Sequence, residues 1–285
     1  MIARCKSPAF LLLLLGFITL APRLAEAEQT PAQDGRLKEI IAGDHRSAEN
    51  KARDKYRNPY ETLTFFGIKP DMTVVEIYPG RGWYTEILAP YLKGNGTLYA
   101  AEHPGDPSYE AVQRSLAAFD EMVKAKPELY GEVKRTKLTK DGDIAPPGSA
   151  DLVVTFRNTH SWIGAGTADD AFATMYKALK PGGVLITHEP GEGHAIAPAS
   201  IEAMRLYGVT ERDMPPHLII RRGEEVGFTN PRILPIPHYL HDIFYSGRTY
   251  PRRLLSKRRW NMTKRVLKML FRPDAGLSAI VVLTK

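Results

Sequence analysis

The sequence predicts an α/β fold in which a parallel β-sheet is covered by helices on both faces. Residues 73–189 alternate between apolar, β-branched runs and amphipathic helical stripes, and such alternation produces parallel strands joined by helices. The chain has 285 residues, 43% of them hydrophobic and 25% charged, so it can bury a large core. No apolar run reaches the ~18 residues that a membrane-spanning helix needs. These observations favour one globular domain over residues 28–285.

The first 27 residues are expected to be a secretory signal. Arg4 and Lys6 precede an apolar stretch from Ala9 to Ala21, and small residues at Ala25 and Ala27 suit a signal peptidase. An N-terminal anchor that is never cleaved is the alternative. Removal of the signal would also remove the single cysteine, which excludes disulfides, thiolate metal sites and a cysteine nucleophile. The expected location is therefore outside the cytoplasm, in the periplasm.

Helices are expected before the alternating region, in residues 28–66. Leu37, Ile40 and Ile41 recur at helical spacing within a charged stretch, which predicts one or two amphipathic helices over residues 36–57. A proline follows at position 59 and interrupts the pattern, so a separate short helix is expected over the next residues.

The expected core, residues 67–190, begins with a buried strand. Residues 73–77 are apolar and β-branched and follow a Pro70-Asp71 turn, which is typical of a strand inside a parallel sheet. Residues 83–92 favour a helix, which a glycine-rich turn ends. The later elements are predicted in the same way: strands at 97–102, 133–138, 151–156, 183–187, 232–236 and 277–283, and helices near 109–122, 172–179 and 218–227.

The turn after the first strand predicts a ligand site, because ligands of open parallel sheets bind beyond the carboxyl ends of the strands. Gly80 and Gly82 allow positive φ and remove Cβ atoms, and the following helix offers free N–H groups. Glu102 ends the second strand, where an acid can accept hydrogen bonds from both ribose hydroxyls. Glu76 suits an ammonium group and would repel a pyrophosphate, and Thr85 leaves the dinucleotide motif incomplete. A cofactor containing a nucleoside is expected; a dinucleotide or a purely structural glycine turn are the alternatives.

Residues 63–189 resemble the class I S-adenosylmethionine-dependent methyltransferases in several short segments. These are residues 74–82, similar to the family's first motif; 141–143, where the family often places the acid that contacts the adenine amino group; 150–154, similar to the entry to the fourth strand; and 179–183, similar to the turn before the fifth. Residues 65–70 and 157–162 further resemble a little-characterised subgroup that often carries export signals.

The resemblance implies a Rossmann-like, seven-stranded, mostly parallel sheet with an antiparallel last strand, and S-adenosylmethionine as the cofactor. The cofactor-binding residues expected in this way are Glu76, Tyr78, Gly80, Gly82, Glu102, Asp141 and Asp143. Tyr78 departs from the family pattern, which has glycine there, and narrows the space near the methionine part of the cofactor.

The chemistry of methyl transfer indicates which other residues matter. It is an in-line displacement, so an enzyme mainly holds the two reactants close together and dry, and an oxygen or nitrogen acceptor must also lose a proton. Arg157, Asn158 and His160 follow the fourth strand on the expected cofactor side. His160 is the expected base, Asn158 would orient the acceptor, and Arg157 would attract an anionic substrate. A histidine that merely caps the strand end is the equal alternative. The loop at residues 188–194 is expected to be structural or to line the substrate site rather than to bind metal.

Positive charge is concentrated in residues 247–272, which contain 10 basic residues and no acidic one. Apolar residues at near-helical spacing predict a basic helical insertion there. It could lie on an anionic membrane surface, form a lid over the acceptor pocket, or be a solvated excursion between strands. Nucleic acid is not expected as a partner, because the remainder of the chain after the signal is net acidic.

The sequence therefore predicts an exported, S-adenosylmethionine-dependent methyltransferase with a small-molecule or lipid-like acceptor. The methyl donor is made in the cytoplasm, and nothing in the sequence explains its supply outside. The alternative is a non-catalytic envelope module that binds a nucleoside-like or other small ligand on the same fold.

Overall fold

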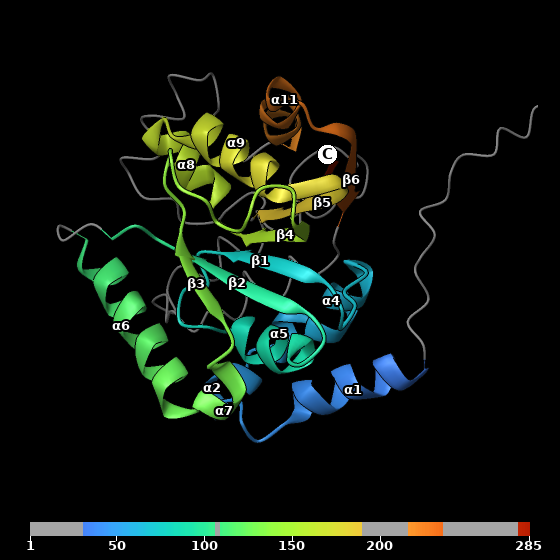
Figure 1. Ribbon diagram of the computed structural model, residues 1–285, viewed down its shortest axis with the longest axis vertical. Helices are drawn as coiled ribbons and strands as arrows, with labels where there is room; N and C mark the ends of the chain where they lie inside the picture. The colour runs from blue at the N-terminus through green and yellow to red at the C-terminus, as the bar shows by residue number, and fades with distance from the viewer. Residues whose placement is uncertain (1–30, 106–108, 190–215, 236–278) are drawn as a thin grey trace, which may run out of the picture.

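A seven-stranded sheet organises the computed structural model, which describes residues 31–105, 109–189, 216–235 and 279–285 (Figure 1). The strand order is β3-β2-β1-β4-β5-β7-β6. The strands are β1 (Thr73–Ile77), β2 (Thr97–Glu102), β3 (Lys134–Lys137), β4 (Ala150–Phe156), β5 (Leu179–Glu189), β6 (Thr229–Pro235) and β7 (Ala279–Thr284). The chain-terminal strand β7 runs antiparallel to both of its neighbours, and the other pairings are parallel. The predicted fold class is confirmed.

Helices lie on both faces of the sheet (Figure 1). They are α1 (Pro31–Ala42), α2 (Ala48–Lys51), α3 (Asp54–Arg57), α4 (Pro59–Phe65), α5 (Thr85–Leu92), α6 (Glu110–Ala125), α7 (Pro127–Tyr130), α8 (Thr159–Ala165), α9 (Ala168–Ala178) and α11 (Pro216–Val226). One apolar core joins the sheet to α8, α9 and α11, and a second joins it to α1, α4 and α5. Val74 and Val75 on β1 enter opposite cores, because successive strand side chains point to opposite faces.

Two helices differ from the expectation. The stripe over residues 109–122 does form a helix, but of the residues of α6 only Phe119 is fully buried, and Tyr109 just before it is 61% exposed. Through Phe119 and Met122, this helix packs on the glycine turn after β1. Helix α8 was not predicted, since its seven residues are too few for an apolar stripe to be recognised.

Strand β5 is longer at both ends than the sequence indicated. It begins at Leu179 with an irregular register against β4, and it continues through His188, which pairs with Ile280 of β7. His188 and Glu189 therefore belong to the strand instead of following it. The hydrogen bonds to β7 account for the extension, because strand pairing satisfies the backbone groups of these residues.

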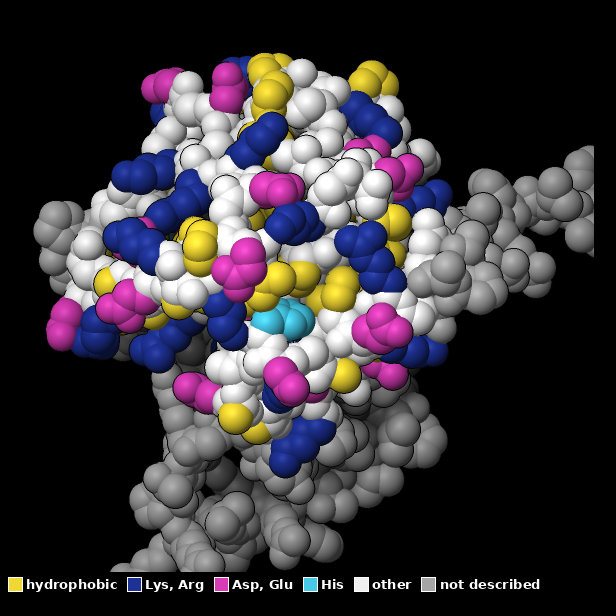
Figure 2. Space-filling model, turned by 60° about the horizontal axis from the view of Figure 1, so that its bottom comes forward, with side chains coloured by type: hydrophobic (Ala, Val, Ile, Leu, Met, Phe, Trp, Pro, Cys, Tyr) yellow, Lys and Arg dark blue, Asp and Glu magenta, His cyan; other side chains and the backbone are white. Residues whose placement is uncertain are grey.

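The expected signal at residues 1–27 and the basic segment at 247–272 lie outside the described residues. Within the described ranges, no helix is both long and apolar enough to cross a membrane. Figure 2 shows positive and negative side chains interspersed over the described part of the face that it turns forward.

Candidate functional site

The ends of β1 and β2 bring together the first group of predicted site residues. The register pairs Ile77 with Ala101, and the Tyr78 N–H donates to the Ala101 carbonyl oxygen at 2.8 Å. Glu76, Tyr78 and Glu102 therefore lie within two residues of one another along neighbouring strands. These three residues therefore lie close together at the carboxyl ends of the strands, as the sequence predicts.

The two glycines of the turn after β1 have different reasons to be glycine. Both adopt positive φ, 63° at Gly80 and 86° at Gly82. A Cβ at Gly82 would overlap the Met122 sulfur of α6 and lie 3.4 Å from the Phe119 ring. Among the described residues, a Cβ at Gly80 would approach only Ser115 Oγ, at 3.8 Å. Gly82 thus allows α6 to pack closely, whereas Gly80 leaves bare backbone at the site.

The carboxyl group of Glu76 is buried beneath the turn. The residue is 2% exposed, and the Thr85 hydroxyl of α5 donates to its Oε2 at 2.6 Å. Burial raises the pKa of Glu76 to about 7, against the opposing effects of the Thr85 hydrogen bond and the Arg57 charge. A ligand that carries a positive charge would stabilise the ionised form of this carboxyl group, which burial disfavours.

Tyr78 forms an aromatic wall at the same edge. Its φ of 51° is unusual for a residue with a side chain. The ring centroid lies 4.9 Å from that of His103, after β2, and 5.8 Å from that of Trp162 on α8. Burial raises the pKa of the Tyr78 hydroxyl. The ring is thus fixed between two other aromatic residues where the family pattern has glycine.

Glu102 has a cationic partner that the sequence analysis did not identify. Arg135 on β3 donates from Nε to Glu102 Oε1 and from Nη2 to Oε2, the second at 3.1 Å. Its Nη1 donates to Asp120 Oδ1 on α6 at 2.8 Å. These contacts raise the pKa of Arg135 above its ordinary range, with the Glu102 hydrogen bond as the largest cause. No sequence motif marked this arginine, since β3 consists of four polar residues.

The two acids of the loop after β3 are exposed. Asp143 forms an ion pair with Lys177 of α9 at 2.7 Å, in which both side chains are about half exposed. Asp141 is exposed in the same loop. The Thr136 hydroxyl donates to the Ile144 carbonyl oxygen at 3.0 Å and thus holds the loop against β3. Their proposed contact with an adenine amino group stays a prediction.

The residues after β4 reach the same edge through the pairing of β1 with β4. Asn158 donates from Nδ2 to the Ile77 carbonyl oxygen at 3.3 Å and to Thr155 Oγ1 at 3.0 Å, so its amide joins the two strand ends. Arg157 has a φ of 64°, and its N–H donates to the His188 carbonyl oxygen at 2.7 Å. His160 lies half-buried in the first turn of α8. The predicted roles of these three residues in catalysis remain predictions.

No family model matches the chain, and no curated protein matches it. A SAM-dependent methyltransferase from Aquifex aeolicus superposes with a TM-score of 0.50 at 18% identity, over 71% of this chain and 92% of that one. Phosphoethanolamine N-methyltransferase 2 from Haemonchus contortus, solved with S-adenosyl-L-methionine, gives 0.51 at 16% identity, over 89% of this chain and 57% of that one. The chain has the class I methyltransferase fold.

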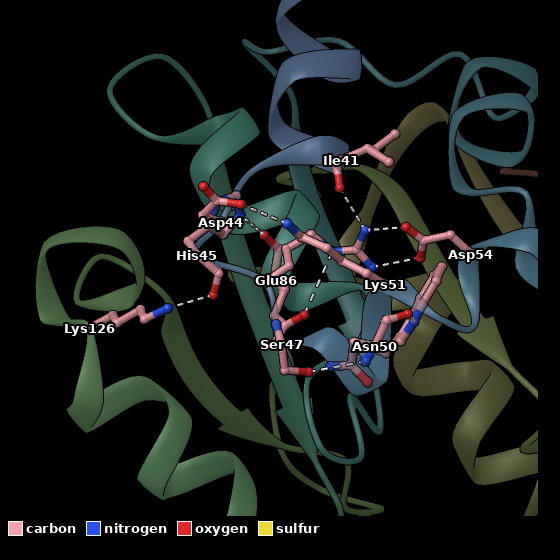
Figure 3. Close-up of polar contacts among 11 residues, drawn as sticks. Ile41, Asp44, His45, Ser47, Asn50, Lys51, Asp54, Glu86 and Lys126 are labelled. Carbon is pink, nitrogen blue, oxygen red and sulfur yellow. Dashed lines mark hydrogen bonds and ion pairs between the residues drawn. The ribbon is translucent and has the colours of Figure 1, made fainter.

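In this methyltransferase fold, the N-terminal helices are attached to α5 by a buried cluster of charges (Figure 3). The Arg46 side chain is fully buried and pairs with both carboxylate oxygens of Asp54, at 2.6 and 2.8 Å. Its Nε also lies 3.6 Å from Glu86 Oε2 on α5. The guanidinium groups of Arg46 and Arg57 lie 5.3 and 4.6 Å from the centre of the Trp83 ring. No sequence motif marked this cluster, and the charge of the neighbouring Arg57 lowers the pKa of Glu76 against the effect of burial.

The residues at the carboxyl ends of β1 and β2 fit S-adenosyl-L-methionine, the molecule present in the Haemonchus contortus structure. Glu76 and Glu102 present one buried carboxyl group each on neighbouring strands, and Gly80 keeps open backbone in the turn after β1. Glu76 suits an ammonium group, and the oxygens of Glu102 suit hydroxyl donors. Tyr78 adds an apolar surface that limits the space beside them.

Proposed function

We propose that the protein is an S-adenosylmethionine-dependent methyltransferase acting on a small-molecule or lipid-like acceptor. The observation that supports this most is the pair of buried acids on the neighbouring strands β1 and β2, beside the turn in which Gly80 leaves open backbone. The fold supports the class of cofactor, and the two acids on neighbouring strands could serve its ammonium and ribose groups. An exported location remains part of the proposal.

The proposed mechanism assigns each residue a limited task. When bound, S-adenosylmethionine supplies a methyl group that is activated by a sulfonium. Glu76 accepts hydrogen bonds from an ammonium group, and Glu102 accepts them from ribose hydroxyls. The ring of Tyr78 excludes water from the neighbouring space, which strengthens electrostatic contacts. His160 receives the proton of an oxygen or nitrogen acceptor, and Arg157 attracts an anionic group of the acceptor.

Binding of S-adenosylhomocysteine, measured by isothermal titration calorimetry, tests the proposal. The wild-type protein should bind with a dissociation constant below ~100 μM. Gly80→Arg should weaken binding at least ~100-fold, because a long side chain would fill the space over the turn. Gly94→Arg is the matched control: Gly94 also has a positive φ, of 82°, and no described atom within 4 Å of an added Cβ, but it lies just before β2, at the amino ends of the parallel strands.

Three results would count against the proposal. Absence of binding by the wild-type protein would contradict the cofactor, and equal losses in the two glycine variants would contradict the site. Binding without formation of S-adenosylhomocysteine from S-adenosylmethionine, across a broad range of acceptors, would favour the non-catalytic binding module instead.

A further inference from the structure

The side chain of Arg135 joins three elements around the ribose end of the proposed site. Its Nε and Nη2 bind the two oxygens of Glu102 on β2, and its Nη1 binds Asp120 on α6. The Glu102 side chain is 8% exposed and that of Arg135 is 37% exposed. The guanidinium carbon also lies 5.6 Å from the centre of the Phe119 ring. Arg135 thus contacts the buried acid from one side and remains partly open to solvent on the other.

The register of β3 explains why this arginine reaches Glu102. Arg135 lies opposite Ala100, two residues before Glu102 and therefore on the same face of the sheet. Lys137 lies directly opposite Glu102 in the register, yet its side chain is exposed. The two basic residues are close in sequence, but only Arg135 has a hydrogen bond to the carboxylate in the structure.

A bidentate guanidinium restricts what the carboxylate can do next. A planar fork with two parallel N–H donors fixes both the position and the plane of a carboxylate, which a lysine ammonium cannot do. Each carboxylate oxygen has two acceptor positions, so each oxygen of Glu102 keeps one after pairing with Arg135. The two parallel positions of the carboxylate are occupied by Arg135, and the remaining position on each oxygen points to the side, so a held Glu102 offers an acceptor of fixed direction to one ribose hydroxyl.

The Nη1 atom of Arg135 links the Glu102 carboxylate to the helix that packs on the glycine turn. Asp120 belongs to α6, and the same helix places Phe119 and Met122 against Gly82. Arg135 therefore connects the acid that would hold the ribose with the helix that packs on the turn. A change at Arg135 should affect the orientation of Glu102 more than the fold of the sheet, since β3 is an edge strand.

We propose that Arg135 is a positioning residue that orients Glu102 to accept a hydrogen bond from the 2′ hydroxyl of a ribonucleoside ligand. This inference rests on the proposed function. It predicts that Arg135 makes the protein bind a ribonucleoside more tightly than the matching deoxyribonucleoside. A role in affinity alone would affect both ligands equally.

The preference can be measured by calorimetry with S-adenosylhomocysteine and its 2′-deoxy analogue. The wild-type protein should bind the ribose form about tenfold more tightly, the effect of one lost hydrogen bond to a charged group. Arg135→Met should reduce the ratio to less than about twofold. Arg135→Lys keeps the charge and should fold normally, with a ratio between these values. Lys137→Met is the matched control and should keep the wild-type ratio.

The outcomes separate the two proposals. If Arg135→Met weakens binding of both ligands but leaves their ratio near tenfold, Arg135 has only a structural role and the inference is wrong. A lysine variant with the full wild-type ratio would contradict the need for a planar fork, and a wild-type protein without preference would show that Glu102 does not read the ribose. If the wild-type protein binds neither ligand, the proposed function itself fails.

Discussion

Two buried glutamates end neighbouring strands, and their partners make them chemically different. The contact of Glu76 at the end of β1 is with the hydroxyl of Thr85, and burial raises the pKa of Glu76 to about 7. Glu102 at the end of β2 is held by the guanidinium of Arg135. The charge of Glu102 is compensated before any ligand arrives, so it suits neutral hydroxyl donors. Glu76 suits a ligand that brings its own positive charge.

The largest expected effect is on the pH dependence of stability, through Glu76. The pKa of this carboxyl group is raised from 4.5 to about 7 in the folded chain. The folded chain therefore binds a proton at Glu76 more tightly than the unfolded chain does. The stability that this protonation contributes is complete below pH 4.5 and decreases as the pH rises to about 7. The loss is about 3 kcal/mol. Urea denaturation at about pH 5 and about pH 8 should show this loss in the wild-type protein and little of it in Glu76→Gln.

An exposed glutamate provides the control for that experiment. Glu61→Gln on α4 should keep the wild-type pH dependence, because Glu61 is exposed. If the stability of the wild-type protein and that of Glu76→Gln depend equally on pH, the pKa of Glu76 is not raised. The proposed chemical difference between Glu76 and Glu102 would then be wrong.

The second prediction concerns the compensated acid. Arg135→Met should lower the free energy of unfolding by about 2 kcal/mol, because it leaves the buried carboxylate of Glu102 unpaired. Arg135→Lys should recover about half of this loss. Urea denaturation near pH 7 measures both. If Arg135→Met is as stable as the wild-type protein, the ion pair does not distinguish β2 from β1.

The third prediction concerns the proton that Glu76 releases when a ligand binds. An ammonium group at Glu76 should favour the ionised carboxylate, so binding of S-adenosylhomocysteine near pH 6 should release close to one proton. Affinity should fall about tenfold for each pH unit below 7. Calorimetry in buffers of different ionisation enthalpy measures the proton release. A binding enthalpy that does not depend on the buffer would show that the ammonium group does not contact Glu76.

The smallest expected effect tests how the end of β1 is held to β4. Asn158→Ala removes the hydrogen bonds to the Ile77 carbonyl and the Thr155 hydroxyl and should cost about 1 kcal/mol of stability. Ser161→Ala, at an exposed position of α8, should have almost no effect. Thermal unfolding of the two variants gives the comparison. Equal melting temperatures would indicate that the side chain of Asn158 is not needed at the strand ends and is available to orient an acceptor.

The part of the site that follows directly from strand ends could be predicted from the sequence. Glu102 ends an apolar run and Glu76 is the last residue but one of another, and parallel strands have their carboxyl ends on the same side of the sheet. Gly82 was predicted as a glycine that faces a ligand, but its need for glycine comes from Met122 on α6. A helical stripe predicts that α6 exists but does not say which surface it meets.

The contacts of Arg46 and Arg135 could not be predicted in this way. Both arginines stand in polar stretches without an apolar period, and each binds acids on other elements: Asp54 and Glu86 in one case, Glu102 and Asp120 in the other. Many arrangements of such residues are compatible with the same local pattern, because charged side chains are long and have many rotamers.

The sequence by itself determined the order of strands and helices, the turn after β1 and the positions of the two acids, because those depend on neighbouring residues with periods of 2.0 and 3.6. Only the tertiary structure decided which of the acids has a cationic partner. The partner of Glu102 lies 33 residues further along the chain, on a strand whose pairing with β2 places Arg135 on the same face as Glu102.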